Sequence, residues 1–110
     1  MNKEEMEKIT FEMITAVNEA RHSYIDAIQS AKNKDFVKAE FLIMQGDAAY
    51  NKGHGCHMQL LQAEAAGEIK NVNLLVLHAE DQMISSESYK IFAIEFLSLY
   101  KELNSLKNNM

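Results

Sequence analysis

The stretch Glu4–Ala31, with the sequence EEMEKITFEMITAVNEARHSYIDAIQSA, decides the fold class of this 110-residue chain. Its apolar residues recur every three or four positions, which is the spacing of one face of an α-helix. The positions of this stripe are Met6, Ile9, Met13, Val17, Ala20, Tyr24, Ala27 and Ala31. The whole chain has no proline and four glycines, so it favours long helices over a many-stranded sandwich or barrel. We therefore expect a helix over about residues 4–31.

Apolar residues at the same spacing predict two more helices, over about residues 36–66 and 74–106. Short polar joints, residues 33–35 and 68–73, separate the three segments. Three long helices with two short joints fold most simply as an antiparallel up-down-up bundle. The sequence thus predicts an all-α fold in one domain, residues 1–110.

Capping and glycine residues refine the predicted second helix. Asp35 stands where an N-cap residue is needed, and Gly67 stands where a residue just past the helix end is needed. Gly46, Gly53 and Gly55 fall inside the helix, and each costs about 1 kcal/mol relative to alanine. A break near residues 53–55 is therefore an open alternative to one continuous helix.

Composition and charge exclude several classes of function. A net charge of −5 with a single arginine, Arg21, argues against nucleic-acid binding and against an arginine cluster that holds phosphate permanently. The single cysteine, Cys56, rules out an internal disulfide and fits a reducing compartment. The N-terminus lacks the apolar run of a signal peptide, and the longest apolar run, Leu74–Leu77, is far below the roughly 18 residues of a membrane span. We expect a cytoplasmic protein without membrane insertion.

The predicted third helix carries a polar strip after an apolar start. His78, Asp81, Gln82, Ser85 and Tyr89 follow one another at spacings of three and four, so they lie along one side of the helix. Such a strip forms either a notch that faces solvent or a polar layer inside an oligomer. Because three helices leave wide apolar faces, self-association would bury the excess.

His78 and Asp81 are the first candidates for chemistry. His78 lies about one turn into its helix, where backbone N–H groups and the helix dipole favour an anion, and its neutral imidazole is a possible nucleophile for a phosphoryl group. Alternatively, it is a packed or surface histidine. Asp81 could orient His78, or it could meet its own copies around a symmetry axis and share a divalent cation. A solvated aspartate is the simpler alternative.

The segment Gly53–His57, with the sequence GHGCH, superficially resembles a metal site. His54 and His57 could supply two ligands, but zinc sites need more, and no second Cys/His pair accompanies them. Polar residues on one helix face are the simpler interpretation, and Cys56 is then an inert small side chain. Phosphate-cradling glycine loops and hydrolase motifs are absent from the sequence.

Several short motifs in the same order resemble one family, the enzyme IIA components of the lactose/cellobiose class of the bacterial sugar phosphotransferase system. The strongest is Leu74–Asp81, LLVLHAED, which is similar to the family's V-H-A-Q-D-H-L-M signature. The other matching residues are Phe11-Glu12, Ala20-Arg21, Ala31–Phe36, Ala39-Glu40, His54, Glu64–Glu68, Glu95-Phe96 and Leu99-Tyr100. The match extends over nearly the whole chain.

The resemblance implies a three-helix protomer in a homotrimer. It implies that His78 accepts a phosphoryl group from phospho-HPr and passes it to a cysteine of the cognate IIB component during uptake of a β-linked disaccharide such as cellobiose, lactose or chitobiose. It also implies that Asp81 meets its copies near the three-fold axis and holds Mg²⁺ or a similar cation. These roles come from the likeness and not from residue spacing.

The signature departs from the family pattern at two positions that flank Asp81. Glu80 replaces the usual glutamine, and Gln82 replaces the usual histidine. We expect both to act as supporting residues of the site: Glu80 would repel a phosphoryl group if both faced the same way, and Gln82 keeps a hydrogen-bond donor without positive charge. Elsewhere, Asn18 stands where glycine is common and His57 where glutamine is common.

Three alternatives remain open at the level of the sequence. A regulatory paralogue would be phosphorylated on His78 without feeding a transporter. A non-catalytic helical module would bind partner helices through its apolar face and take up no phosphate. A small metal-binding bundle would use His54 and His57.

Overall fold

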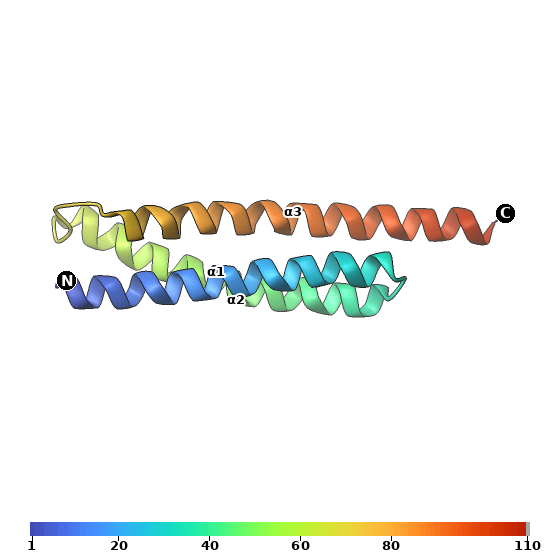
Figure 1. Ribbon diagram of the computed structural model, residues 1–110, viewed down its shortest axis with the longest axis horizontal. Coiled ribbons are helices and arrows are strands. Elements are labelled where there is room, and N and C mark those ends of the chain that lie inside the picture. Colours follow the sequence, from blue (N-terminus) through green and yellow to red (C-terminus); the bar gives the residue numbers. More distant parts are fainter. Residues whose placement is uncertain (110) are drawn as a thin grey trace.

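Three long helices make up the computed structural model, which describes residues 1–109 (Figure 1). They are α1 (Lys3–Lys32), α2 (Phe36–Ala65) and α3 (Leu74–Asn108), and no strand occurs within the described residues. α1 and α3 are parallel to each other, and α2, which connects them, is antiparallel to both (Figure 1). Together they form a rod of 63 × 19 × 16 Å. The predicted all-α, up-down-up bundle is confirmed for the protomer, with every helix boundary within two residues of its predicted position.

Side chains just before each helix set its start. Asn2, Asp35 and Asn73 each accept a hydrogen bond from the backbone N–H three residues later, which satisfies a donor that the helix itself leaves free. Asp35 is thus the N-cap that the sequence predicts. Gly67 follows the C-cap of α2 with a φ of 77°, a left-handed conformation that glycine adopts without strain.

The α2 helix is continuous through its glycines, so the alternative of a break near residues 53–55 is wrong. Two of these glycines let α2 approach α1 closely. A Cβ built on Gly46 would lie 2.5 Å from the Tyr24 ring, and one on Gly53 would lie 2.6 Å from Val17. The packing gained across this close approach offsets the low helix propensity of glycine.

The core runs along α1, which packs against both other helices, whereas α2 and α3 share the least contact. Most of the stripe predicted on α1 is buried, and two clusters form around it. The fully buried side chain of Tyr24 donates a 2.7 Å hydrogen bond to Asp47 on α2, and Lys90 on α3 lies 3.2 Å from the same carboxylate oxygen. This bridge joins the three helices near their middle.

The α3 helix leaves much apolar surface open. Its C-terminal part extends past the turn between α1 and α2 (Figure 1). Leu99, Leu103 and Leu106, in the last ten residues of α3, are between 45% and 63% exposed. Despite these apolar stretches, none of the helices among residues 1–109 combines the length and the hydrophobicity that crossing a membrane requires.

Candidate functional site

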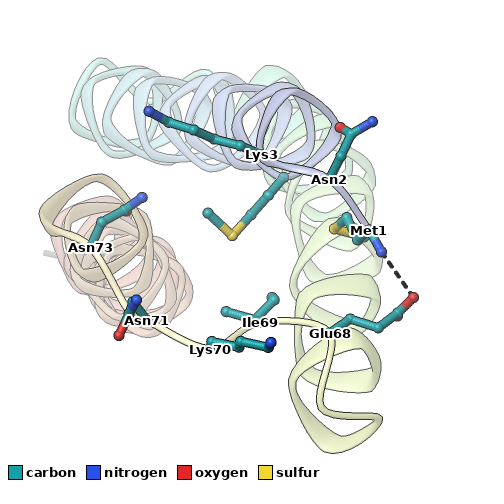
Figure 2. Close-up of a pocket in the computed structure, with 9 residues that line it drawn as sticks. Met1, Asn2, Lys3, Glu68, Ile69, Lys70, Asn71 and Asn73 are labelled. Atoms are coloured by element: carbon teal, nitrogen blue, oxygen red, sulfur yellow. Dashed lines mark hydrogen bonds and ion pairs between the residues drawn. The ribbon is translucent and has the colours of Figure 1, made fainter.

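The joint before α3 is tied to the start of the chain. The Met1 amine forms a 2.9 Å ion pair with Glu68, and this hydrogen bond is the main cause of the raised pKa of the amine (Figure 2). Ile69 packs against the nearby core cluster, while Lys70 and Asn71 continue the joint toward α3. The joint and the N-terminus border a shallow hollow, but the candidate residues of α3 do not line it. We infer that its role is to fix where α3 begins.

His78 lies one turn into α3, as the sequence predicts, and its side chain is exposed. The backbone N–H of Val76 bonds to the Asn73 side chain, and that of Leu77 bonds to the Asn73 carbonyl. Two donors near His78 are therefore already engaged, and the helix start offers fewer free N–H groups to an anion than the sequence suggests. What remains at His78 is an imidazole open to solvent and to a docking protein.

Glu80 faces away from His78 and toward α2. Its carboxylate lies 2.7 Å from Nε2 of His57, whose side chain is 15% exposed. Positions two residues apart project about 200° apart around a helix, so the Glu80 charge does not face a group carried on His78. In the protomer Glu80 bridges α2 and α3 through this contact, and its role as a supporting residue of the site stays a prediction.

Gln82 lies on the same side of α3 as His78, one turn further along. Its Oε1 accepts a 3.0 Å hydrogen bond from Nη1 of Arg21 on α1, and both side chains are half-buried. Through this hydrogen bond, Gln82 links α3 to α1 at the seam between the two helices.

Asp81 is exposed on the outward face of α3, away from the core. No hydrogen bond joins Asp81 to His78 among the described residues, so the interpretation that it orients the imidazole has no support in one protomer. Leu77, Ile84 and Ile91, at 56%, 61% and 56% exposed, continue the same face. Spacings of four, three and seven residues are those of a coiled-coil seam, so Asp81 is a polar position in an apolar, self-complementary stripe.

The candidate metal site on α2 is not assembled in the protomer. The rings of His54 and His57 are 6.3 Å apart, and Nε2 of His57 is already paired with Glu80. Nowhere among residues 1–109 do three His, Cys, Asp or Glu side chains gather as a metal ion requires. Cys56 is buried, and burial is the main cause of its raised pKa, so the thiol is the inert side chain that the sequence predicts.

The chain is similar in sequence to one family of known proteins. Residues 8–101 match the family model described as the lactose/cellobiose-specific IIA subunit of the phosphotransferase system. The chain belongs to this family. This IIA protein is 33% identical over 100 residues to the lichenan-specific phosphotransferase enzyme IIA component of Bacillus subtilis, with 91% of each chain covered. It is thus a component of a sugar phosphotransferase system.

Solved structures agree with this assignment. The cellobiose-specific enzyme IIA of Bacillus anthracis superposes on this IIA protein with a TM-score of 0.88 at 31% identity, covering 96% of this chain and 94% of that one. The chitobiose IIA protein of Escherichia coli, solved in complex with HPr, gives a TM-score of 0.79 at 24% identity, with 90% and 96% covered. The second likeness concerns the fold alone.

Two contacts of the site were missed by reasoning from the sequence, Arg21 with Gln82 and His57 with Glu80. Each joins residues far apart in the chain, and helix periodicity carries no information about such pairs. One signal was present, because His57 and Glu80 both depart from the family's usual glutamine. These two departures lie in contact with each other in the structure.

Proposed function

We propose that this IIA protein is a phosphocarrier that takes a phosphoryl group from phospho-HPr on His78 and passes it to a cysteine of a IIB component. The observation that carries the proposal is the exposed imidazole of His78, held one turn into α3 within the family signature segment. The HPr complex of a protein with the same fold supports HPr as the donor. We expect the protein to work in the cytoplasm.

The proposed chemistry asks little of the protein besides position. The lone pair of a neutral His78 nitrogen forms a bond to phosphorus while the donor's phosphorus–nitrogen bond breaks, leaving its electron pair on the donor imidazole. In the second transfer, a thiolate sulfur of IIB bonds to phosphorus, and the electron pair of the N–P bond returns to His78. Such transfers depend on alignment and charge stabilisation, so an exposed nucleophile on a rigid helix suits them.

The proposed assembly is a homotrimer built on the outward face of α3. The apolar stripe through Leu77, Ile84 and Ile91 supports it, since a single chain leaves these side chains open to water. Three copies of Asp81 would then meet at the axis, where their carboxylate oxygens suit a hard cation such as Mg²⁺. Neutralising this cluster is the contribution that we propose for the cation.

The transported sugar is proposed as a β-linked disaccharide of the cellobiose, lactose or chitobiose type. The relative from Bacillus subtilis is lichenan-specific and the one from Bacillus anthracis is cellobiose-specific, which supports this class of substrate. A regulatory paralogue that is phosphorylated on His78 without serving a transporter is the second candidate, favoured by the unusual residues Glu80 and Gln82 beside the signature histidine.

Replacing His78 with alanine tests the phosphocarrier function. After incubation with phosphoenolpyruvate, enzyme I and HPr, intact mass spectrometry should show one added phosphate per wild-type chain, lost on mild acid treatment. His78→Ala should gain none, because no acceptor nitrogen remains, while its helicity and assembly should be unchanged.

His54→Ala is the matched control for this test, since it removes another exposed histidine and should be phosphorylated like the wild type. Acid-labile phosphate on His78→Ala would overturn the assignment of the carrier residue. A wild-type chain that gains no phosphate would instead favour a non-catalytic interaction module.

A further inference from the structure

Arg21 brings an unpaired positive charge to the side of α3 that carries His78. It is the only arginine of the chain, and its half-buried guanidinium donates from Nη1 to Gln82. No carboxylate forms an ion pair with it within residues 1–109. A guanidinium has five N–H donors, and the neutral oxygen of Gln82 accepts from one of them. A charge held in this way can bind an anion that arrives from outside.

The guanidinium contacts Gln82, a residue one helical turn from the candidate phosphorylation site. Residues four apart are neighbours on a helix surface, so Gln82 follows His78 along the same side of α3. Helical side chains tilt toward the N-terminus of their helix, which directs the Gln82 amide toward His78. Arg21 reaches that amide across the seam between α1 and α3. The seam therefore places a fork of N–H donors at the residue that follows His78 by one turn on the same side of α3.

We propose that the guanidinium of Arg21 binds the phosphoryl group while His78 carries it. The proposal rests on the phosphocarrier function proposed above and names a residue that stabilises the carried state. Arg21 forms no covalent bond and moves no proton in this role. Its N–H groups donate to phosphoryl oxygens, and Gln82 holds the guanidinium in the seam before the phosphoryl group arrives.

The charges around the site explain why such a residue is needed. Phosphorylation adds about two negative charges, and Asp81 already lies one turn from His78. Glu80 contacts His57, whereas Asp81 forms no ion pair within residues 1–109, and one divalent cation at the proposed axis would leave three Asp81 carboxylates with a net negative charge. One guanidinium offsets part of this repulsion. A single contact also leaves onward transfer feasible, because a permanent clamp would stabilise the carrier too strongly.

The single arginine allows a direct test without mutation. In ¹⁵N-labelled protein, the Nε–H group of Arg21 gives one side-chain resonance of its kind. Phosphorylation by phosphoenolpyruvate, enzyme I and HPr should shift this resonance and slow its exchange with water, because the guanidinium becomes hydrogen-bonded to phosphoryl oxygens. The same mixture with His78→Ala should leave it unchanged.

Substitutions supply the second readout, the equilibrium constant for phosphoryl exchange with phospho-HPr. Arg21→Gln should shift this equilibrium away from the carrier by roughly tenfold, the loss expected for one charge-assisted contact. The equilibrium constant of Arg21→Lys should lie between those of the wild type and Arg21→Gln, since lysine keeps the positive charge but lacks the forked N–H donors of a guanidinium. Lys101→Gln is the matched control: it removes one positive charge at the Glu40 ion pair, far from His78, and should leave the equilibrium as in the wild type.

The outcomes separate this proposal from the one on which it rests. A wild-type chain that takes up no phosphate overturns both. A chain that takes up phosphate while its Arg21 resonance stays in place, and whose Arg21→Gln variant exchanges like the wild type, overturns the role of Arg21 and leaves the phosphocarrier function intact. Should Arg21→Gln lose helicity, the resonance of the wild-type protein and the Arg21→Lys variant still decide the matter.

Discussion

At the scale of single residues, side chains that are close together in residues 78–82 contact different parts of the molecule. His78 is open to solvent, Glu80 binds His57 on α2, Asp81 faces outward, and Gln82 binds Arg21 on α1. Because each helical step turns the chain by about 100°, His78 and Gln82 point to one side of α3, Asp81 points outward and Glu80 points toward α2. One short segment can therefore present a nucleophile, anchor two helices and form an oligomer contact.

Tyr24 carries the clearest pH dependence of stability. Its pKa is raised above the ordinary value of 10.0, first by burial and then by its hydrogen bond to Asp47. The folded state therefore holds this proton more tightly than the unfolded state. The contribution of Tyr24 to the free energy of unfolding is full below pH ~10 and declines as the pH rises above it.

Replacing Tyr24 with phenylalanine should lower the free energy of unfolding by about 1–2 kcal/mol at pH 7, because the hydrogen bond to the Asp47 carboxylate is lost. Urea titrations at pH 7 and at pH 11 would measure it. The difference from the wild type should shrink at the higher pH. Tyr100→Phe, which alters a ring stacked on Phe96, serves as the control for removing a tyrosine hydroxyl that does not contact Asp47. An equal difference at both pH values would contradict the role given to the Tyr24 proton.

At the scale of elements, α2 shows how tertiary contact overrides local preference. Its glycines predict a weak helix, and a break near residues 53–55 was an alternative at the level of the sequence. The helix is nevertheless continuous from Phe36 to Ala65. Gly46 and Gly53 are buried against Tyr24 and Val17, whereas Gly55 has open space where a Cβ would be. Glycines at the first two positions are required by packing, and Gly55 is not.

The glycines of α2 can be separated by alanine substitution. Gly46→Ala should lower the free energy of unfolding by about 1–3 kcal/mol, because the new Cβ overlaps the buried Tyr24 ring. Gly55→Ala should raise it by up to about 1 kcal/mol, since alanine is the better helix former and meets nothing. Chemical denaturation of both variants measures the contrast. If both substitutions shifted the free energy of unfolding in the same direction, the conclusion that packing against Tyr24 requires glycine at position 46 would be contradicted.

At the scale of the whole molecule, the protomer is a thin rod that cannot cover its own apolar surface. The α3 stripe and the part of α3 beyond the α1–α2 turn stay open in one chain (Figure 1). A rod 16 Å across at its narrowest has little interior, so assembly is the available way to bury these side chains. This surface supports the proposed trimer and the place of Asp81 within it.

Replacing Asp81 with leucine tests the axial position. If three copies meet at an axis, the variant should remain trimeric and be stabilised by about 1–4 kcal/mol per trimer, because a cluster of like charges is removed. Sedimentation and thermal unfolding, each with and without a chelator, would measure this. The wild type should lose stability on chelation and the variant should not. The control is Asp26→Leu, on an exposed side of α1. Dissociation of Asp81→Leu to monomers would contradict the proposed axis.

The helices themselves were predictable because their causes are local. An apolar stripe at helical spacing, an N-cap at Asp35 and a left-handed glycine at position 67 each act within a few residues of chain. The place of His78 one turn into the third helix also followed from the sequence. The partner of Glu80, His57, could not be predicted from the sequence, since it depends on which helix packs opposite Glu80.

The sequence by itself determined the helical class, the three segments and the residue that we propose to carry phosphate. Only the tertiary structure decided that Arg21 reaches Gln82, that Glu80 turns to His57 and that Gly46 admits the Tyr24 ring. The reason is physical. Periodicity and capping are fixed by interactions along one helix, whereas the partner of a side chain depends on how helices distant in sequence are rotated and offset against each other.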